Sequence, residues 1–262
     1  MQRRDFNKQL LSAGLASLSG IWPWSAGKTH ILSLSFDDGF KNSFQKIADI
    51  YEKHDLKACL NVIASAHLKG FKQVDDWILP ELMGDFDIWN GLAKRGHEIM
   101  PHSWKHLNLA RIHLPKAKRL INKCLDYFEE HLEGYNPDYA VFNFPFNSSN
   151  PALEQFTLQR VKGIRTFGQG AINPIPQKDK PLKISCSSYG PTNIDAWVNK
   201  NIQDFLADPK GGWMVLNLHG LDTEGWGPIS TGFLKKQLEQ LTKIDYLEIM
   251  PAGEVLKRTI GN

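Results

Sequence analysis

The chain has 262 residues, 42% of them hydrophobic and 11% aromatic, which is enough to bury one sizeable core and argues against intrinsic disorder. With 31 Lys and Arg against 28 Asp and Glu, the formal charge is only +3. No long basic run follows the first residues, so a nucleic-acid partner is not expected. Three Cys without a CxxC pair argue against a zinc ribbon and a dense disulfide framework.

The first 26 residues have the features of a targeting signal. Arg3 and Arg4 precede Phe6 and a weakly apolar run rich in Gly, Ala, Ser and Leu, a pattern that resembles a twin-arginine export signal. The alternative to an export signal is an amphipathic first helix. The run is shorter than the roughly 20 residues that a bilayer requires. We therefore predict a signal at 1–26 and a mature domain at 27–262, which is exported to the periplasm or the medium and has no membrane span.

From His30 onward, apolar runs alternate with segments of helical period. Strands are expected at residues 30–36, 57–64, 97–101, 139–146, 163–167, 182–188, 213–219 and 246–251. Helices are expected at residues 42–54, 77–94, 114–132, 152–161, 195–207 and 231–242. Residues 168–181 lack a helical pattern and are predicted to form a surface crossover loop. The alternation predicts one α/β domain built as a distorted (β/α) barrel of about seven to eight strands.

Polar residues follow three of the predicted strands. Asp37 and Asp38 follow the first, His102 and His106 follow the third, and His219 ends the seventh. In a βα barrel these ends share one face, where active sites assemble. An Asp-Gly turn or an HxxxH pair is a weak signal when it stands alone. Together at one face, these carboxylates and imidazoles would be costly to bury unpaired, and a metal ion would offset that cost.

These segments carry a family resemblance. Residues 35–39 read S-F-D-D-G, residues 96–99 read G-H-E-I and lead into H-S-W-K-H at 102–106, and residues 216–219 read L-N-L-H. They resemble the motifs of the polysaccharide deacetylase (NodB homology, carbohydrate esterase 4) family over about Thr29 to Thr259. The resemblance implies a metal-dependent hydrolase that removes N-acetyl or O-acetyl groups from a polysaccharide or oligosaccharide.

Carried over position by position, the resemblance implies a role for each residue. Asp38, His102 and His106 would bind a divalent metal, with zinc expected and cobalt or nickel suited to the same ligands. Asp37 would be the general base. His219 would be the general acid that protonates the leaving amine nitrogen.

The family's third motif is matched only in part. Asn143 stands where the family has Arg, while Pro145 and Phe146 are kept, and the Phe146 backbone N–H is the implied oxyanion donor. The lost Arg is expected to orient the base, and Lys105 is the nearest candidate for a compensating cation. Asp195 could be what is left of the family's fourth motif, or simply part of a helix start.

Two tryptophans near the predicted active face, Trp104 and Trp226, could offer flat surfaces for a sugar ring, although core packing is favoured for Trp104. Two alternatives stay open. One is a hydrolase of the same architecture that acts on small cyclic amides or imides. The other is a catalytically weak carbohydrate-binding protein, suggested by Asn143. A non-haem iron oxygenase uses similar ligands, but it is expected on a jelly roll rather than on alternating strands and helices.

Overall fold

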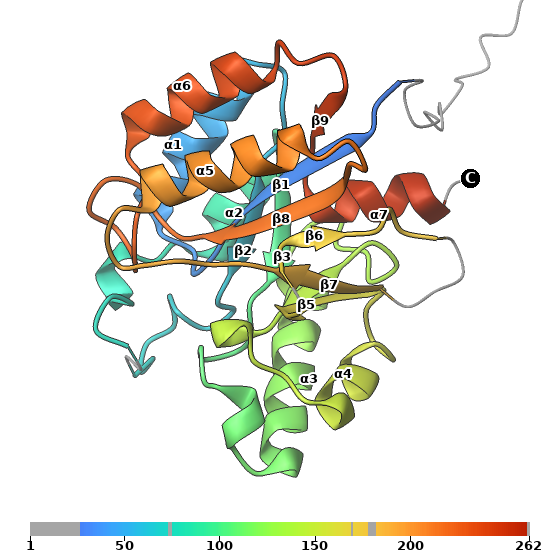
Figure 1. Cartoon of the computed structure of the whole chain (residues 1–262). Coiled ribbons are helices and arrows are strands. Elements are labelled where there is room, and N and C mark those ends of the chain that lie inside the picture. Colours follow the sequence, from blue (N-terminus) through green and yellow to red (C-terminus); the bar gives the residue numbers. More distant parts are fainter. Residues whose placement is uncertain (1–26, 73–74, 169, 178–181, 261–262) are drawn as a thin grey trace, which may run out of the picture.

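A computed structural model describes residues 27–72, 75–168, 170–177 and 182–260. The predicted export signal at 1–26 lies outside these residues. The described chain is an α/β fold in which helices surround a distorted barrel of mainly parallel strands (Figure 1). The strands are β1 (His30–Phe36), β2 (Cys59–Val62), β3 (Glu98–Pro101), β4 (Val141–Asn143), β5 (Gly163–Phe167), β6 (Ile172–Asn173), β7 (Leu182–Cys186), β8 (Gly212–Leu218) and β9 (Leu247–Ile249). The helices are α1 (Lys41–Glu52), α2 (Phe86–Lys94), α3 (Leu114–His131), α4 (Pro151–Thr157), α5 (Ile194–Ala207), α6 (Thr231–Leu241) and α7 (Ala252–Ile260).

Strand β1 is the centre of the larger sheet, and all of its residues are buried. It pairs with β8 along its whole length, whereas β2 pairs with its carboxyl end and β9 with its amino end. The larger sheet has the order β3-β2-β1-β8-β6, with β9 also paired to β1, and the smaller sheet has the order β4-β5-β7. A single parallel bridge from Ser187 to Leu216 joins the two sheets near β7 and β8. Among the described residues no ladder joins β3 to β4, so hydrogen bonds do not close the barrel there.

The helices cover the strands through apolar faces. In α1 the buried residues Phe44, Ile47, Ala48 and Tyr51 recur at spacings of three and four, which places them on one side of the helix. Helices α1, α5 and α6 lie on one side of the strands, and α3 and α4 on the other (Figure 1). The buried side chains of both groups join the strands in one main hydrophobic core.

The predicted α/β alternation is confirmed, and the differences have local causes. The helix predicted at 77–94 begins only at Phe86, because the Asp85 carboxylate accepts the N–H of Ile88 and fixes the helix start there. Pro80–Leu82 forms a short 3₁₀ turn before it. The predicted crossover loop contains β6, which pairs antiparallel with β8. Helix α7 was not predicted.

Two further observations concern the cysteines and the helices. Cys59, Cys124 and Cys186 are all buried and free in the structure. None of the helices in the described ranges is long and apolar enough to cross a membrane.

Glu98 on β3 gives the fold a pH dependence. Its carboxylate accepts the thiol of Cys59 at 3.3 Å and backbone N–H groups of Gly253 and Glu254 at the start of α7, and burial raises its pKa from 4.5 to about 7. A raised folded-state pKa gives stability that is fully present below about pH 4.5 and is lost as the pH rises through 7. At about 1.4 kcal/mol per pH unit, the loss is at most about 3 kcal/mol.

Glu98→Gln removes this titration. Urea unfolding should therefore show the variant gaining up to about 3 kcal/mol relative to the parent between pH 4.5 and pH 8. The exposed Glu81 provides the control, because Glu81→Gln should show no such gain. An equal free-energy difference between Glu98→Gln and the parent at both pH values would contradict the prediction.

Candidate active site

The carboxyl ends of three parallel strands bring the predicted site residues together. Asp37 and Asp38 follow β1, and His219 follows β8, whose Leu218 is paired with Phe36 at the end of β1. His102 follows Pro101, the residue of β3 that pairs with the last residue of β2. Because these strands end at one level, five side chains far apart in the sequence share one face of the barrel.

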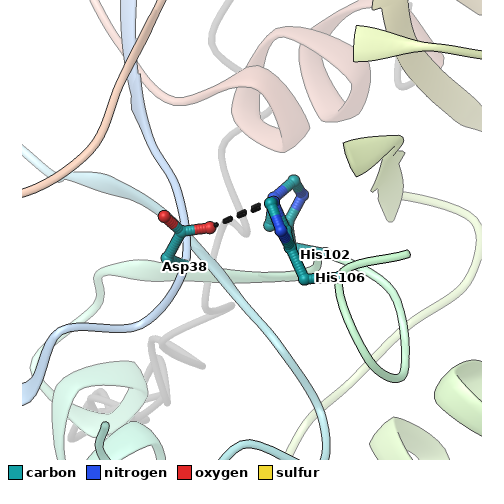
Figure 2. Close-up of side chains that lie close together, drawn as sticks. All are labelled: Asp38, His102 and His106. Atoms are coloured by element: carbon teal, nitrogen blue, oxygen red, sulfur yellow. Dashed lines mark ion pairs between the residues drawn. The ribbon is translucent and has the colours of Figure 1, made fainter. Parts of the chain in front are cut away.

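Three of these side chains form a possible metal cluster. One ligand atom each from Asp38, His102 and His106 lies within 4.8 Å of the other two, and Figure 2 shows both imidazoles facing the carboxylate. The Nε2 atoms of His102 and His106 lie 3.5 and 3.4 Å from Asp38 Oδ1. Both carboxylate oxygens of Asp38 are buried without a hydrogen-bond partner. A buried carboxylate in this state is costly, and two imidazoles with one carboxylate fit a divalent cation such as zinc.

The backbone around the cluster is unusual. Asp38, Ser103 and His106 have positive φ angles of 82°, 67° and 52°, a conformation that non-glycine residues rarely adopt. The Ser103 hydroxyl accepts the N–H of His106 at 3.0 Å and closes the turn that carries the second imidazole. Strain of this kind persists where the surrounding structure enforces it, and here it places three ligand atoms around one point.

The charges of the cluster are set by burial and by its neighbours. Burial raises the pKa of Asp38, but the imidazoles of His106 and His102 lower it more, so its pKa lies below the ordinary value. Burial lowers the pKa of His219, and the nearby carboxylates offset this only in part. The His219 ring lies edge-on to Trp226, with the ring centroids 5.7 Å apart.

Asp37, the predicted base, receives four hydrogen bonds. Its Oδ1 accepts from Asn61 at 2.7 Å and from Arg165 Nη1 at 2.9 Å, and its Oδ2 accepts from Arg165 Nη2 at 2.5 Å and from Asn217 at 2.7 Å. Burial raises the pKa of Asp37, but the guanidinium of Arg165 and the imidazole of His102 lower it more, so the carboxyl is held ionised. The fork-to-fork pair also fixes the plane of the carboxylate.

Arg165 is the functional residue that sequence reasoning missed. It lies on β5, is only 1% exposed, and is the register partner of Asn143 on β4. Arg165 therefore lies at the same level as Asn143, on the strand next to the position where the family resemblance implies an arginine. The cation paired with Asp37 is therefore Arg165 rather than Lys105. The signal in the sequence was an Arg inside a predicted strand, because strands of a parallel sheet are buried on both faces and charged residues are rarely buried without a partner.

Asn143 keeps an indirect link to the base. Its amide donates to Asn61 Oδ1 at 2.9 Å, and Asn61 in turn donates to Asp37. Its backbone carbonyl lies 2.9 Å from His102 Nδ1. Asn143 thus contacts both the metal cluster and the network around the base.

The other predicted residues separate into neighbours of the site and structural residues. Phe146, which follows Pro145, has a φ of 59°, and its ring centroid lies 4.8 Å from that of His106. Asp195 lies in the first turn of α5, and both of its carboxylate oxygens accept hydrogen bonds from Ser230. Asp195 therefore holds Ser230, the N-cap residue of α6, in place. Trp104 is buried in the core, as favoured from the sequence.

A hollow of about 450 Å³ lies beside Phe146 at the carboxyl ends of β4 and β5. Phe146 and Phe167, which line it, are 45% and 65% exposed. Lys183 and Asn150 contribute polar groups to the lining. A larger hollow of about 860 Å³ is lined by residues of β3, β9 and α7, Glu98 among them. None of the predicted ligands lines either hollow, but Phe146 links the smaller one to the cluster, because its ring packs against that of His106.

Comparison with known proteins shows the family to which the chain belongs. Residues 25–162 match the sequence model of the family described as polysaccharide deacetylase. The chain belongs to the polysaccharide deacetylase family, whose members are hydrolases of carbon–nitrogen bonds. An uncharacterized 30.6 kDa protein of Geobacillus stearothermophilus is 29% identical over 98 residues, which are 37% of this chain and 31% of that relative. The match therefore spans less than a third of the relative's length.

Solved structures share the fold. A protein of Mycobacterium smegmatis assigned as a polysaccharide deacetylase has a TM-score of 0.68 at 14% identity and covers 92% of this chain and 93% of its own. The peptidoglycan deacetylase PdaC of Bacillus subtilis has a TM-score of 0.54 at 19% identity, covering 88% and 91%. The pseudoenzyme BA3943 of Bacillus anthracis has a TM-score of 0.56 at 14% identity, covering 87% and 66%. The fold is thus similar to that of both an enzyme and a pseudoenzyme, so function rests on the site residues.

Proposed function

We propose that this protein is a metal-dependent carbohydrate deacetylase that hydrolyses N-acetyl or O-acetyl groups on a polysaccharide or oligosaccharide. The observation that carries the proposal is the buried pair of Asp37 and Arg165 beside the carboxylate of Asp38, which has two imidazoles nearby but no hydrogen-bond partner. Arg165, on the strand next to Asn143, supplies the cation that the family resemblance implies at position 143. The base therefore keeps its charge and its orientation.

In this proposal Asp38, His102 and His106 hold the cation, with zinc the expected metal and cobalt or nickel also suited. A bound cation supplies Lewis acidity, which polarises the acyl carbonyl and lowers the pKa of a water. Asp37 accepts the proton of the attacking water while Arg165 keeps the carboxylate in place. His219 donates a proton to the leaving nitrogen, and the Phe146 backbone N–H, beside Pro145, stabilises the oxyanion.

Several features favour a carbohydrate substrate. The hollow next to Phe146 is lined by the exposed rings of Phe146 and Phe167, and the Phe146 ring also packs against His106 of the cluster. Exposed flat apolar rings suit the face of a sugar. Trp226, which is half-buried and packs against His219, offers a further aromatic ring. Exposed aromatic side chains around an open hollow favour a chain-like sugar over a small cyclic amide, which would suit an enclosed pocket.

A binding protein with weak catalysis is the second candidate. Its support is that four donors already occupy Asp37, about the full capacity of a carboxylate. To act as a base, Asp37 has to exchange one of these donors for the water. The amides of Asn61 and Asn217 are the two neutral donors, one on each oxygen, so either of them is easier to exchange than the charged guanidinium of Arg165.

The proposal also includes the setting of the protein. Residues 1–26 would act as a twin-arginine-type export signal, and residues 27–262 would form the mature deacetylase domain in the periplasm or outside the cell. A deacetylase of extracellular glycans requires such a location, because its polymeric substrates lie beyond the cytoplasmic membrane.

Acetate release tests the proposal. The parent is assayed with chitooligosaccharides, peptidoglycan fragments and acetylated xylan, with and without chelator and added zinc, cobalt or nickel. Asp37→Asn and His219→Ala should each lower kcat by roughly a hundredfold or more with metal content unchanged, because general acid–base catalysis contributes about 10² to 10⁴. A parent that binds metal and glycan but releases no acetate from any substrate would instead support the binding protein.

A further inference from the structure

We propose that Asp75 is a positioning residue for the metal cluster, which fixes the His106 imidazole and strengthens it as a ligand. The inference rests on the metal site of the proposed function and adds a residue that none of the family-like motifs contains. Asp75 lies in the loop between β2 and α2. Its side chain is 14% exposed and its Oδ2 lies 2.7 Å from His106 Nδ1.

The contact decides which nitrogen of His106 is available to a cation. A carboxylate without a proton can only accept hydrogen bonds, so His106 carries a hydrogen on Nδ1 and donates it to Asp75 Oδ2. The lone pair of Nε2 is then free, and Nε2 is the nitrogen that faces Asp38 at 3.4 Å. His102 is oriented in the same way, but its Nδ1 lies against the backbone carbonyl of Asn143 at 2.9 Å.

The two imidazoles therefore differ in what supports them. A carbonyl group is a neutral acceptor, whereas the carboxylate of Asp75 adds a negative charge next to His106. A carboxylate behind a ligating histidine raises the basicity of the ligand and holds its ring in one orientation. We infer that the metal is bound more tightly through His106 than it would be with a carbonyl acceptor at the same place.

The loop that carries Asp75 is anchored next to Asp38. The backbone carbonyl of Asp75 accepts the N–H of Ile78 at 3.1 Å, and Ile78 is fully buried in a small apolar cluster with Phe40 and Met83. Phe40 follows Asp38 by two residues and pairs with Met83 in an isolated antiparallel bridge. The loop that carries Asp75 is thus packed against Phe40, which is close in the chain to the ligand Asp38. This packing keeps Asp75 next to His106.

Metal affinity tests this inference independently of turnover. The dissociation constant for zinc is measured by competition with a chromophoric chelator for the parent, Asp75→Ala, Asp75→Asn and the control Asp76→Asn, whose side chain is exposed. Asp75→Ala should weaken binding by about 10- to 100-fold. Asp75→Asn keeps an acceptor but loses the charge, so it should weaken binding less. Asp76→Asn should bind like the parent.

Thermal unfolding of the metal-free variants separates positioning from folding. The turn at Asp75 uses its backbone carbonyl, so the Tm of the metal-free protein should change little in Asp75→Ala. Unchanged zinc affinity in Asp75→Ala, or equal weakening in Asp76→Asn, would overturn the inference and leave the proposed function standing. A parent that binds no zinc would overturn both.

Discussion

A variant that carries both His102→Ala and His106→Ala should lose stoichiometric metal and acetate release together. Removing two of the three ligands leaves the Asp38 carboxylate alone in a buried site, and each ligand contributes several kcal/mol to zinc binding. Metal content after dialysis, measured by elemental analysis, checks the first half of the prediction. Acetate release in the presence of added zinc checks the second.

The exposed His113 provides the control for this double variant. His113→Ala removes an imidazole that lies outside the cluster, so its metal content and its turnover should equal those of the parent. Stoichiometric metal retained by the double variant would place the cation elsewhere in the protein and would refute the assignment of the cluster.

Arg165→Asn should lower kcat by about a hundredfold or more. The change removes both N–H···O bonds to Asp37 and leaves a buried carboxylate without its cation, so burial then raises the pKa of Asp37. Breaking a buried ion pair from one side typically costs about 3–5 kcal/mol of stability. Urea unfolding is therefore measured with kcat, so that lost turnover is scored only where the protein is folded.

Two matched variants sharpen this result. Arg165→Lys keeps the charge but loses the bidentate geometry, so it should remain folded and should recover only part of the turnover. Arg160→Asn removes a partly exposed arginine whose ion pairs are with Asp126 and Glu129, and it should leave kcat unchanged. Parent-like turnover in a folded Arg165→Asn variant would show that the base needs no cation.

Much of the fold follows from local pattern. The strands at 30–36 and 163–167 have the predicted bounds, because all of β1 and the first four residues of β5 are buried in parallel sheets. The location of the site could also be predicted from the sequence, since residues at the carboxyl ends of parallel strands must share one face. Helix α2 was placed too early because the apolar spacing around Trp77 resembles a helix, while that segment packs instead as a loop around its own small core.

The parts of the site that escaped prediction depend on contacts across the fold. Arg165 reaches Asp37 from 128 positions away, and only the pairing of β4 with β5 reveals that it stands beside Asn143. Asp75 meets His106 from a loop 31 positions earlier in the chain. Neither contact leaves a local spacing pattern, so the sequence pointed to Lys105, the cation nearest along the chain, as the compensating residue.

We propose that Arg165 takes the place of the arginine that the family resemblance implies at Asn143, so that the base remains competent. An exchange of the two residues, Asn143→Arg with Arg165→Asn, tests this proposal. The exchanged protein should regain at least tenfold in kcat over Arg165→Asn, because one guanidinium again faces Asp37 from the same level of the barrel. Asn143→Arg alone should lower kcat, because two guanidinium groups would then share one buried carboxylate. A folded exchange variant no more active than Arg165→Asn, together with a single Asn143→Arg variant as active as the parent, would contradict the account.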